Sequence, residues 1–165
     1  MILVDTALKA REMEGRPIRV GLLGAGFISR GLANHIVNTT PGMRLVGVYN
    51  RTVQRALDLC EYAEARDAVS AASQAEVDSA IRHGKVAATG DAFLLARSSE
   101  VDVLVDVTGS VEFGGRVACE AFRHGKDVVL LNAEIDVTIA FAADGQALRA
   151  DLARHEHLRG KAPRV

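Results

Sequence analysis

The sequence predicts an α/β fold in which a doubly wound, mainly parallel sheet is covered by helices on both faces. Short apolar runs alternate with stretches of helical spacing along most of the chain. Residues 18–31 read IRVGLLGAGFISRG, an apolar run followed by two closely spaced glycines and a helical pattern. The 165 residues, 48% hydrophobic and 25% charged, suffice for one domain that buries its own core.

The composition argues against several classes of partner. The formal net charge of −1 provides no long-range field that would attract nucleic acid or anionic lipid. No apolar run approaches the roughly 20 residues of a membrane span, and the N-terminus lacks a secretory signal. Cys60 and Cys119, the only cysteines, lie far apart in the sequence, which argues against a disulfide framework. We therefore expect a cytoplasmic protein that binds neither nucleic acid nor a membrane.

The first elements follow from apolar spacing and stop signals. A helix over residues 5–14 ends at Gly15-Arg16-Pro17, so residues 1–16 are predicted to form a helical appendage. The apolar run 18–23 is typical of a buried strand. The next helix, over 27–38, is stopped by Thr39-Thr40-Pro41-Gly42. Its apolar residues one turn apart are Ile28, Leu32 and Ile36.

The middle of the chain is less regular. Residues 44–49 predict the second strand, and a helix is expected from Thr52, as N-cap, to about Ala65. The stretch 64–80 is rich in Ala, Ser and acids, and its ordered part is predicted as a helix over 74–83. Residues 86–89 are predicted to form a short third strand.

The alternation continues to residue 131. The predicted order is a helix over 91–97, a strand over 101–107, a helix over 112–124 and a strand over 128–131. The helix over 112–124 is expected to direct four apolar side chains toward the sheet, those of Phe113, Val117, Ala121 and Phe122. The tail, residues 138–165, is predicted to be helical or frayed, which leaves 17–137 as the main domain.

The two glycines after the first strand predict a phosphate site. Gly24 permits a tight turn, and Gly26 lets the backbone approach a pyrophosphate without a Cβ in the way. The helix that begins near Phe27 directs its positive end at the anion. Ser29, a small residue, occupies the third position of the usual G-x-G-x-x-G spacing. Placed between a strand and a helix, the motif predicts a Rossmann-type dinucleotide-binding unit.

The residues after the second strand bear on which coenzyme binds. An Asp or Glu there would accept hydrogen bonds from the adenosine ribose and repel a 2′-phosphate. Asn50 can still bond a hydroxyl, and Arg51 can pair with a phosphate and stack on adenine, which favours NADP and leaves NAD open. The plainer alternative is that Arg51 is simply exposed after a strand. The missing acid also argues against a methyltransferase that uses S-adenosylmethionine.

Two later loops are expected at the same edge of the sheet, where open α/β sheets bind ligands. Thr108-Gly109-Ser110 follows the fourth strand and is placed to contact the nicotinamide half of the coenzyme. Asn132-Ala133-Glu134 follows the fifth strand and is placed to border the site of hydride transfer. The alternatives are an ordinary polar turn and a loop with one solvated acid. The pattern identifies no catalytic residue.

The histidines predict no metal site. His35, His83 and His124 lie near the ends of predicted helices, where an imidazolium is favoured by the helix dipole. His155 and His157 would diverge on a helix, so a solvated face is the simpler interpretation.

Taken together, these motifs resemble the NAD(P)-binding domain of homoserine-dehydrogenase-like oxidoreductases. Within that group the chain is most similar to the SAF-domain oxidoreductases that include the deoxyxylulose phosphate reductoisomerase-like enzymes. The resemblance covers most of residues 1–136, in MILVDTALKARE, IRVGLLGAGF, NTTPGMRLVGVYNRT, VDVTGSVEFGGRV and HGKDVVLLNAEID. It implies that the coenzyme's pyrophosphate is held by Gly24, Ala25, Gly26, Phe27 and Ile28, its adenosine 2′-phosphate end by Asn50 and Arg51, and its nicotinamide ribose by Thr108 and Gly109. We add Asn132 to the predicted coenzyme site.

The resemblance has two departures. Homoserine dehydrogenases proper have a Lys where Glu134 stands, which argues against homoserine as the substrate. Members of the branch continue into a catalytic and dimerising domain, whereas here the likeness fades near Thr138. We therefore expect a truncated chain that binds the coenzyme and turns over little.

The resemblance implies that the full-length enzyme passes a hydride between nicotinamide and a small carbonyl or alcohol compound, phosphorylated or not. It leaves a homo-oligomer open. The alternative is a Rossmann module that senses nucleotides without catalysis.

Overall fold

The structure, a computed structural model, describes residues 2–65 and 67–131. The helices are α1 (Ile2–Met13), α2 (Phe27–Asn38), α3 (Val53–Tyr62), α4 (Gln74–Arg82), α5 (Ala92–Arg97) and α6 (Val111–Arg123). The strands are β1 (Ile18–Leu23), β2 (Met43–Tyr49), β3 (Ala68–Ser70), β4 (Val86–Thr89), β5 (Val103–Asp106) and β6 (Asp127–Leu130). None of the described helices is both long and apolar enough to span a bilayer.

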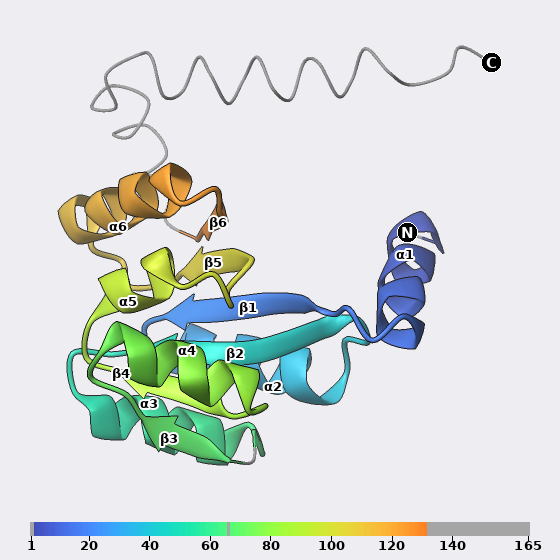
Figure 1. The fold of residues 1–165 in the computed structure, drawn as a ribbon, viewed down its shortest axis with the longest axis horizontal. Coiled ribbons are helices and arrows are strands. Elements are labelled where there is room, and N and C mark those ends of the chain that lie inside the picture. The colour runs from blue at the N-terminus through green and yellow to red at the C-terminus, as the bar shows by residue number, and fades with distance from the viewer. Residues whose placement is uncertain (1, 66, 132–165) are drawn as a thin grey trace, which may run out of the picture.

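The strands form one six-stranded sheet in the order β3-β4-β2-β1-β5-β6 (Figure 1). Every neighbouring pair is parallel. From β1 the chain enters β2, continues to the edge strand β3 and returns to β4, which lies between β3 and β2. It then crosses to the other side of β1, where β5 and β6 follow in order. This is the doubly wound sheet that the sequence predicts, and its order reverses beside β1.

Apolar residues on both faces of the sheet bury the core. Helices α2 and α3 cover one face, and α4, α5 and α6 cover the other (Figure 1). Successive side chains of a strand point to opposite faces, so in β1 Leu22 packs toward α2 and α3 while Leu23 packs toward the other layer. Burial on both faces explains why these strands are almost continuously apolar.

Two glycines in the central strands make room for a neighbouring side chain, Leu95 of α5 beside Gly47 and Leu104 of β5 beside Gly21. A Cβ on Gly47 of β2 would stand 2.5 Å from Leu95 Cδ2, and one on Gly21 of β1 would stand 2.7 Å from Leu104 Cδ2. Leu95, at the centre of α5, is fully buried over these strands. Gly47 therefore marks a close approach of α5 to the sheet.

Several elements differ from the prediction, among them α1, which begins at Ile2 rather than at residue 5. Strand β3 was not predicted, because three residues at the edge of the sheet are too few to show an apolar period. Helix α3 ends at Tyr62 rather than near Ala65, and Glu64 then adopts a positive φ of 56° that ends the helix. Strand β5 is shorter than the predicted 101–107.

Two side chains expected in the core are exposed. Ile28 is 56% exposed and Phe122 is 38% exposed. In α2 the buried face is instead Ser29, Ala33 and Ile36, a stripe of helical spacing shifted by one residue from Ile28. Small residues on that stripe let the helix lie close to the sheet, and in α6 Ala118 and Ala121 do the same beside Val117.

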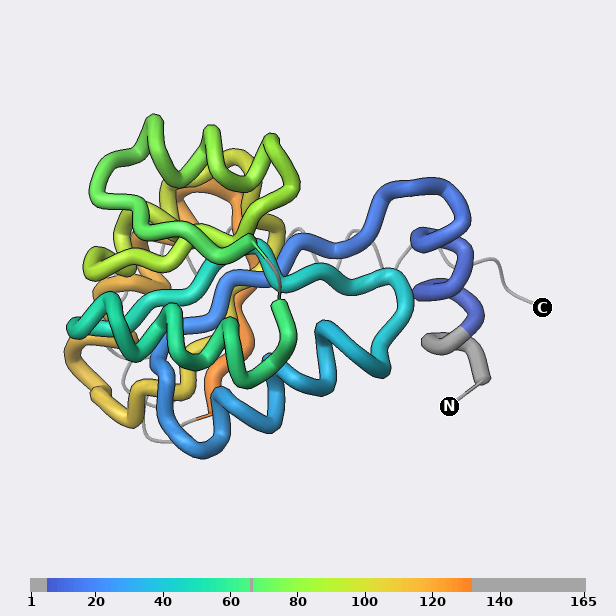
Figure 2. The backbone as a smooth tube through the Cα atoms, turned by 90° about the horizontal axis from the view of Figure 1, so that it is seen from below, coloured from blue at the N-terminus to red at the C-terminus, as the bar shows by residue number. Residues whose placement is uncertain are grey.

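Helix α1 lies to one side of the sheet, beside the turn that leads into β2 (Figure 2). The carboxylate of Glu12 accepts a hydrogen bond from the N–H of Gly42 at 2.9 Å. Arg16 and Pro17 then carry the chain into β1. The described part of the predicted appendage, residues 2–16, thus contacts the start of the sheet and lies at the edge opposite the carboxyl ends of the strands.

Histidines lie at the C-terminal ends of three helices, as predicted, His35 in the last turn of α2 and His83 and His124 directly after α4 and α6. His83 Nδ1 lies 2.7 Å from the carbonyl oxygen of Ser79, and His124 Nδ1 lies 2.9 Å from that of Glu120. His35 Nδ1 lies 2.6 Å from the hydroxyl of Thr39. Within residues 2–65 and 67–131 no group of three or more His, Cys, Asp or Glu side chains is placed to hold a metal ion. The predicted pair His155 and His157 lies outside the described residues.

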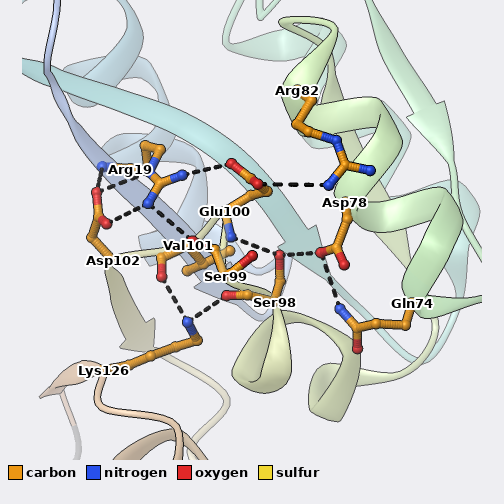
Figure 3. A network of polar contacts seen from close by, with 10 residues as sticks. All are labelled: Arg19, Gln74, Asp78, Arg82, Ser98, Ser99, Glu100, Val101, Asp102 and Lys126. Carbon is orange, nitrogen blue, oxygen red and sulfur yellow. Dashed lines mark hydrogen bonds and ion pairs between the residues drawn. The ribbon is translucent and has the colours of Figure 1, made fainter.

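A polar network joins the elements at the amino ends of the central strands (Figure 3). Arg19 of β1 pairs with Asp102 at 2.8 Å and with Glu100 at 2.7 Å. The ammonium of Lys126, which is 6% exposed, donates to the carbonyl oxygens of Ser98 and Val101. The network therefore ties the segment before β5 to β1 and to the turn after α6.

Breaking the Arg19–Asp102 pair should reduce the pH dependence of stability in acid. Burial alone raises the pKa of Asp102, but the hydrogen bonds and charge of Arg19 outweigh it and hold that pKa below its usual range. The stabilisation is complete above the ordinary carboxyl pKa of about 4 and is lost as the pH falls through the lower pKa of the folded state. Arg19→Gln should lower the urea midpoint at neutral pH. On acidification this variant should lose less stability than the parent does, as followed by circular dichroism.

The matched control is Arg123→Gln, since Arg123 is exposed and, among the described residues, forms an ion pair only with Glu120, at 3.3 Å on the same helix. We expect this variant to behave as the parent does. Equal loss of stability on acidification in the parent and in Arg19→Gln would contradict the assignment.

Candidate functional site

A cleft of about 380 Å³ opens where β1, β2 and β5 end. This is the position beside β1 at which the strand order reverses, and open parallel sheets bind ligands there. The predicted site residues that line it are Gly24, Ala25, Gly26, Asn50, Arg51 and Thr108. The structure therefore brings together residues that are far apart in the chain. Phe27, Ile28 and Gly109 lie outside the lining, and Asn132 lies outside the described residues.

Volume alone would not select this cleft. A hollow of about 590 Å³ beside α3 is larger, but Glu61, Glu64 and Asp67 line it and would repel a phosphate. Another, of about 530 Å³ beside α1, holds several arginines. There Arg19 is already paired with Asp102, and Arg44 donates to the carbonyl oxygen of Gly84. Charge and free hydrogen-bonding groups favour the cleft at the carboxyl ends of the strands.

The two glycines of the turn after β1 have different roles. The fold requires a glycine at position 24, whereas at position 26 the protein itself leaves room for a side chain. Gly24 has a φ of 110°, and a Cβ there would contact Val107 at 3.4 Å. Its N–H donates to the carbonyl oxygen of Tyr49 at 2.8 Å, which closes the turn onto β2. A Cβ on Gly26 would meet no protein atom within 4 Å. The space in front of Gly26 is therefore open, as a backbone contact with a ligand needs.

Helix α2 begins at the cleft without a side-chain cap. Its N-cap residue is Gly26, and its first turn contains no acidic residue. The first N–H that finds an acceptor inside the helix is that of Arg30, which donates to Gly26 O at 3.2 Å. The capping positions of α4 and α5, in contrast, hold Ser73 and Asp91, whose side chains accept hydrogen bonds. The start of α2 thus presents amide donors and positive dipole charge to an anion.

Ser29 fills the third position of the glycine motif and is fully buried. Its hydroxyl has no hydrogen-bond partner among the described residues. A glycine at this position normally permits close packing of helix on strand. Ser29 leads the buried stripe of α2 and performs that packing role.

The end of β2 carries positive charge. Asn50 Nδ2 donates to the carbonyl oxygen of Thr52 at 3.0 Å, and its Oδ1 is left as an acceptor. Arg51 is exposed, and Arg55 follows one turn later on α3. Neither guanidinium forms an ion pair with a described residue, and none of the described residues that line the cleft is acidic.

An aromatic pair forms part of the cleft wall. The rings of Tyr49 and Phe113 stack with centroids 5.2 Å apart, linking the end of β2 to the first turn of α6. Burial raises the pKa of the Tyr49 phenol, and the nearby Arg51 cation opposes this shift. The pair therefore offers a neutral, apolar surface at physiological pH.

Sequence reasoning missed part of the lining. The additional residues are Tyr49, Arg55, Val107 and Phe113, while Ser110 belongs to the predicted loop 108–110. Two of them are direct neighbours of predicted residues, and Arg55 lies four positions after Arg51, a spacing that places both on one side of a helix start. Phe113 was predicted only as a core residue.

The wall at the end of β5 is held by Asp106, which is 1% exposed. Its Oδ1 accepts the N–H of Thr108 at 2.8 Å and the hydroxyl of Thr108 at 2.7 Å. This local turn directs Thr108 to the cleft. The hydroxyl of Thr108 is also 3.4 Å from the N–H of Ser110, the residue that precedes α6.

A parallel sheet with a glycine turn and an uncapped helix at its switch point defines the class of Rossmann dinucleotide-binding domains. The model of the family described as "Homoserine dehydrogenase, NAD binding domain" matches residues 24–159. The chain belongs to this family, and the predicted resemblance to homoserine-dehydrogenase-like oxidoreductases is confirmed. The match extends beyond the described residues.

Solved structures agree on the fold. The myo-inositol dehydrogenase from Lactobacillus casei, in complex with NAD(H) and myo-inositol, is 15% identical with a TM-score of 0.51, covering 69% of this chain and 28% of that one. The scyllo-inositol dehydrogenase from the same organism, with bound NAD(H) and scyllo-inositol, is 15% identical with a TM-score of 0.51, covering 69% and 27%. The chain thus spans under a third of these dehydrogenases. No curated protein sequence matches it.

Proposed function

We propose that this domain binds NADP for an oxidoreductase that passes a hydride between nicotinamide and a small carbonyl or alcohol compound. One observation carries the proposal: the uncapped start of α2 shares a cleft with Arg51 and Arg55, and no described residue lining that cleft is acidic. Membership of the family, whose description includes NAD binding, supports it.

The residues of the cleft fit the parts of the coenzyme. The backbone N–H groups at the start of α2 bind the pyrophosphate. Phe27 and Ile28 contribute through these amides, because their side chains, 91% and 56% exposed, lie outside the lining. Arg51 and Arg55 bind the 2′-phosphate as charge-assisted donors. Asn50 accepts from an adenosine ribose hydroxyl.

The bound coenzyme supplies or accepts the hydride, and the protein supplies binding and orientation. The wall formed by Thr108 and the start of α6 borders the nicotinamide half. In the two inositol dehydrogenases, the part that matches this chain is 28% and 27% of their length. We accordingly assign coenzyme binding to the part of the chain that matches them.

Arg51→Asp tests the preference for NADP. Loss of a charged hydrogen bond to phosphate costs about 1.5–3 kcal/mol, so the Kd for NADPH should rise by roughly 10- to 100-fold. The Kd for NADH should stay the same or fall, since a carboxylate there accepts from the ribose hydroxyls. Isothermal titration of the parent and the variant with both coenzymes measures the two changes.

The control for this titration is Arg123→Asp, an equal change of charge on the exposed part of α6. It should leave both dissociation constants within about twofold of the parent, since distant surface charges are screened. Equal weakening of NADPH and NADH by Arg51→Asp, or no weakening of either, would contradict a 2′-phosphate site at Arg51.

A further inference from the structure

We infer that Asp106, which was not among the predicted site residues, acts as a positioning residue that makes Thr108 an acceptor toward the ligand. The inference rests on the proposed function and deepens it. Asp106 Oδ1 receives both hydrogen bonds of Thr108, at 2.8 Å from the N–H and 2.7 Å from the hydroxyl. Its Oδ2 is enclosed and has no hydrogen-bond partner among the described residues. Asp106 therefore acts on a ligand only through Thr108.

The carboxylate determines which role the hydroxyl of Thr108 plays. A carboxylate oxygen accepts and does not donate, so the hydroxyl of Thr108 must give its single proton to Asp106. Its oxygen then has only acceptor capacity left. The N–H of Ser110, at 3.4 Å, is a long contact that uses this capacity weakly. Because Thr108 lines the cleft, it presents a hydrogen-bond acceptor there.

A hydrogen-bond acceptor at Thr108 favours some groups of a dinucleotide over others. Phosphate oxygens are themselves acceptors, so they gain nothing from Thr108 and are bound instead by the amides of α2 and by Arg51. The hydroxyls of a ribose and the N–H groups of a carboxamide are donors, and they match Thr108. The cleft thus has a donor-rich end for phosphates and an acceptor end for the nicotinamide nucleoside.

The hydrogen bond to Asp106 keeps the Thr108 hydroxyl in the orientation in which it can only accept from a ligand. Without the carboxylate, the hydroxyl could rotate and donate to a phosphate placed at the wrong end. The N–H bond to Asp106 also holds the turn that leads to Gly109, whose φ is 68°. One buried side chain therefore fixes both the place of Thr108 and the direction of its proton.

The test compares two ligands in isothermal titrations. NADPH contains the nicotinamide nucleoside, and 2′,5′-ADP keeps the adenosine 2′-phosphate but lacks that nucleoside. Thr108→Val should raise the Kd for NADPH by about 5- to 10-fold, as expected for one lost hydrogen bond. It should leave the Kd for 2′,5′-ADP within about twofold, and Thr108→Ser should restore NADPH binding, because serine keeps the hydroxyl.

Double substitution separates action through Thr108 from a general structural effect. Asp106→Ala should weaken NADPH about as much as Thr108→Val does, and the double variant should lose no more than either single variant. Asp106→Asn keeps an acceptor oxygen for Thr108, so its folded fraction should bind NADPH within about threefold of the parent. This variant keeps the test decisive if Asp106→Ala does not fold.

Unchanged NADPH binding in Thr108→Val would overturn the inference, as would fully additive losses in the double variant or a loss in Asp106→Asn equal to that in Thr108→Val. In these cases binding of 2′,5′-ADP by the parent still supports the proposed function. Failure of the folded parent to bind either ligand would instead overturn the proposed function itself.

Discussion

Gly26→Ala is expected to weaken NADPH binding by about 100-fold while the domain stays folded, which corresponds to about 2.7 kcal/mol. A Cβ at this position meets no protein atom within 4 Å, and the backbone conformation, φ −86° and ψ −167°, is open to alanine. The new methyl group instead occupies the space through which a pyrophosphate reaches the amides of α2. Isothermal titration gives the affinity, and urea unfolding followed by circular dichroism gives the stability.

Two further glycine variants sharpen this expectation. Gly26→Ser adds a hydroxyl that can cap α2, so it should slightly stabilise the fold and still abolish binding, since the cap competes for the same amides. Gly31 lies on the same helix with open space around it, and Gly31→Ala should stabilise the helix by up to about 1 kcal/mol with unchanged affinity. If Gly26→Ala binds NADPH as the parent does, the ligand does not approach this backbone.

Leu95→Ala is expected to destabilise the domain by about 2–5 kcal/mol. Leu95 is fully buried in the layer of α4, α5 and α6, where it sits over Gly47 of β2. Removing it leaves a cavity between α5 and the sheet. Because a domain of this size is stable by only about 5–15 kcal/mol, the urea midpoint should fall strongly.

The space beside Leu95 allows a sharper test of the same contact. Gly47→Ala alone should destabilise by about 1–3 kcal/mol, because the added methyl overlaps Leu95. In the Leu95→Ala background the same methyl partly fills the cavity, so Gly47→Ala should then cost nothing or stabilise. Additive losses in the double variant would show that Gly47 does not face Leu95.

Much of the fold could be predicted because it depends on short-range patterns. The limits of β1 and α2 follow from an apolar run, a glycine pair and a Thr-Thr-Pro-Gly stop, all within a few residues of the elements they bound. Strand β3 depends instead on pairing with β4, since a run of only three residues forms a strand when a neighbour offers its edge. The shifted buried stripe of α2 likewise depends on how closely the helix approaches the sheet.

In the candidate site, too, some residues could be predicted from local sequence and others depend on tertiary contacts. Gly24, Gly26 and Arg51 stand at positions that local sequence marks, directly after strands. The role of Asp106 depends on burial and on the turn made by Thr108, and the stacking of Tyr49 on Phe113 joins segments from opposite halves of the chain. Such contacts arise only when the sheet brings the ends of β2 and β5 to one edge.

The central claim is that the amides at the start of α2 bind the pyrophosphate of the coenzyme. The most direct measurement is a titration of the ¹⁵N-labelled chain with NADPH, followed by two-dimensional NMR. We predict that the largest shifts occur at the N–H groups of Gly26, Phe27 and Ile28, with smaller shifts at Arg51 and Thr108. A folded chain whose shifts are absent, or gather beside α1 or α3 instead, would contradict the account.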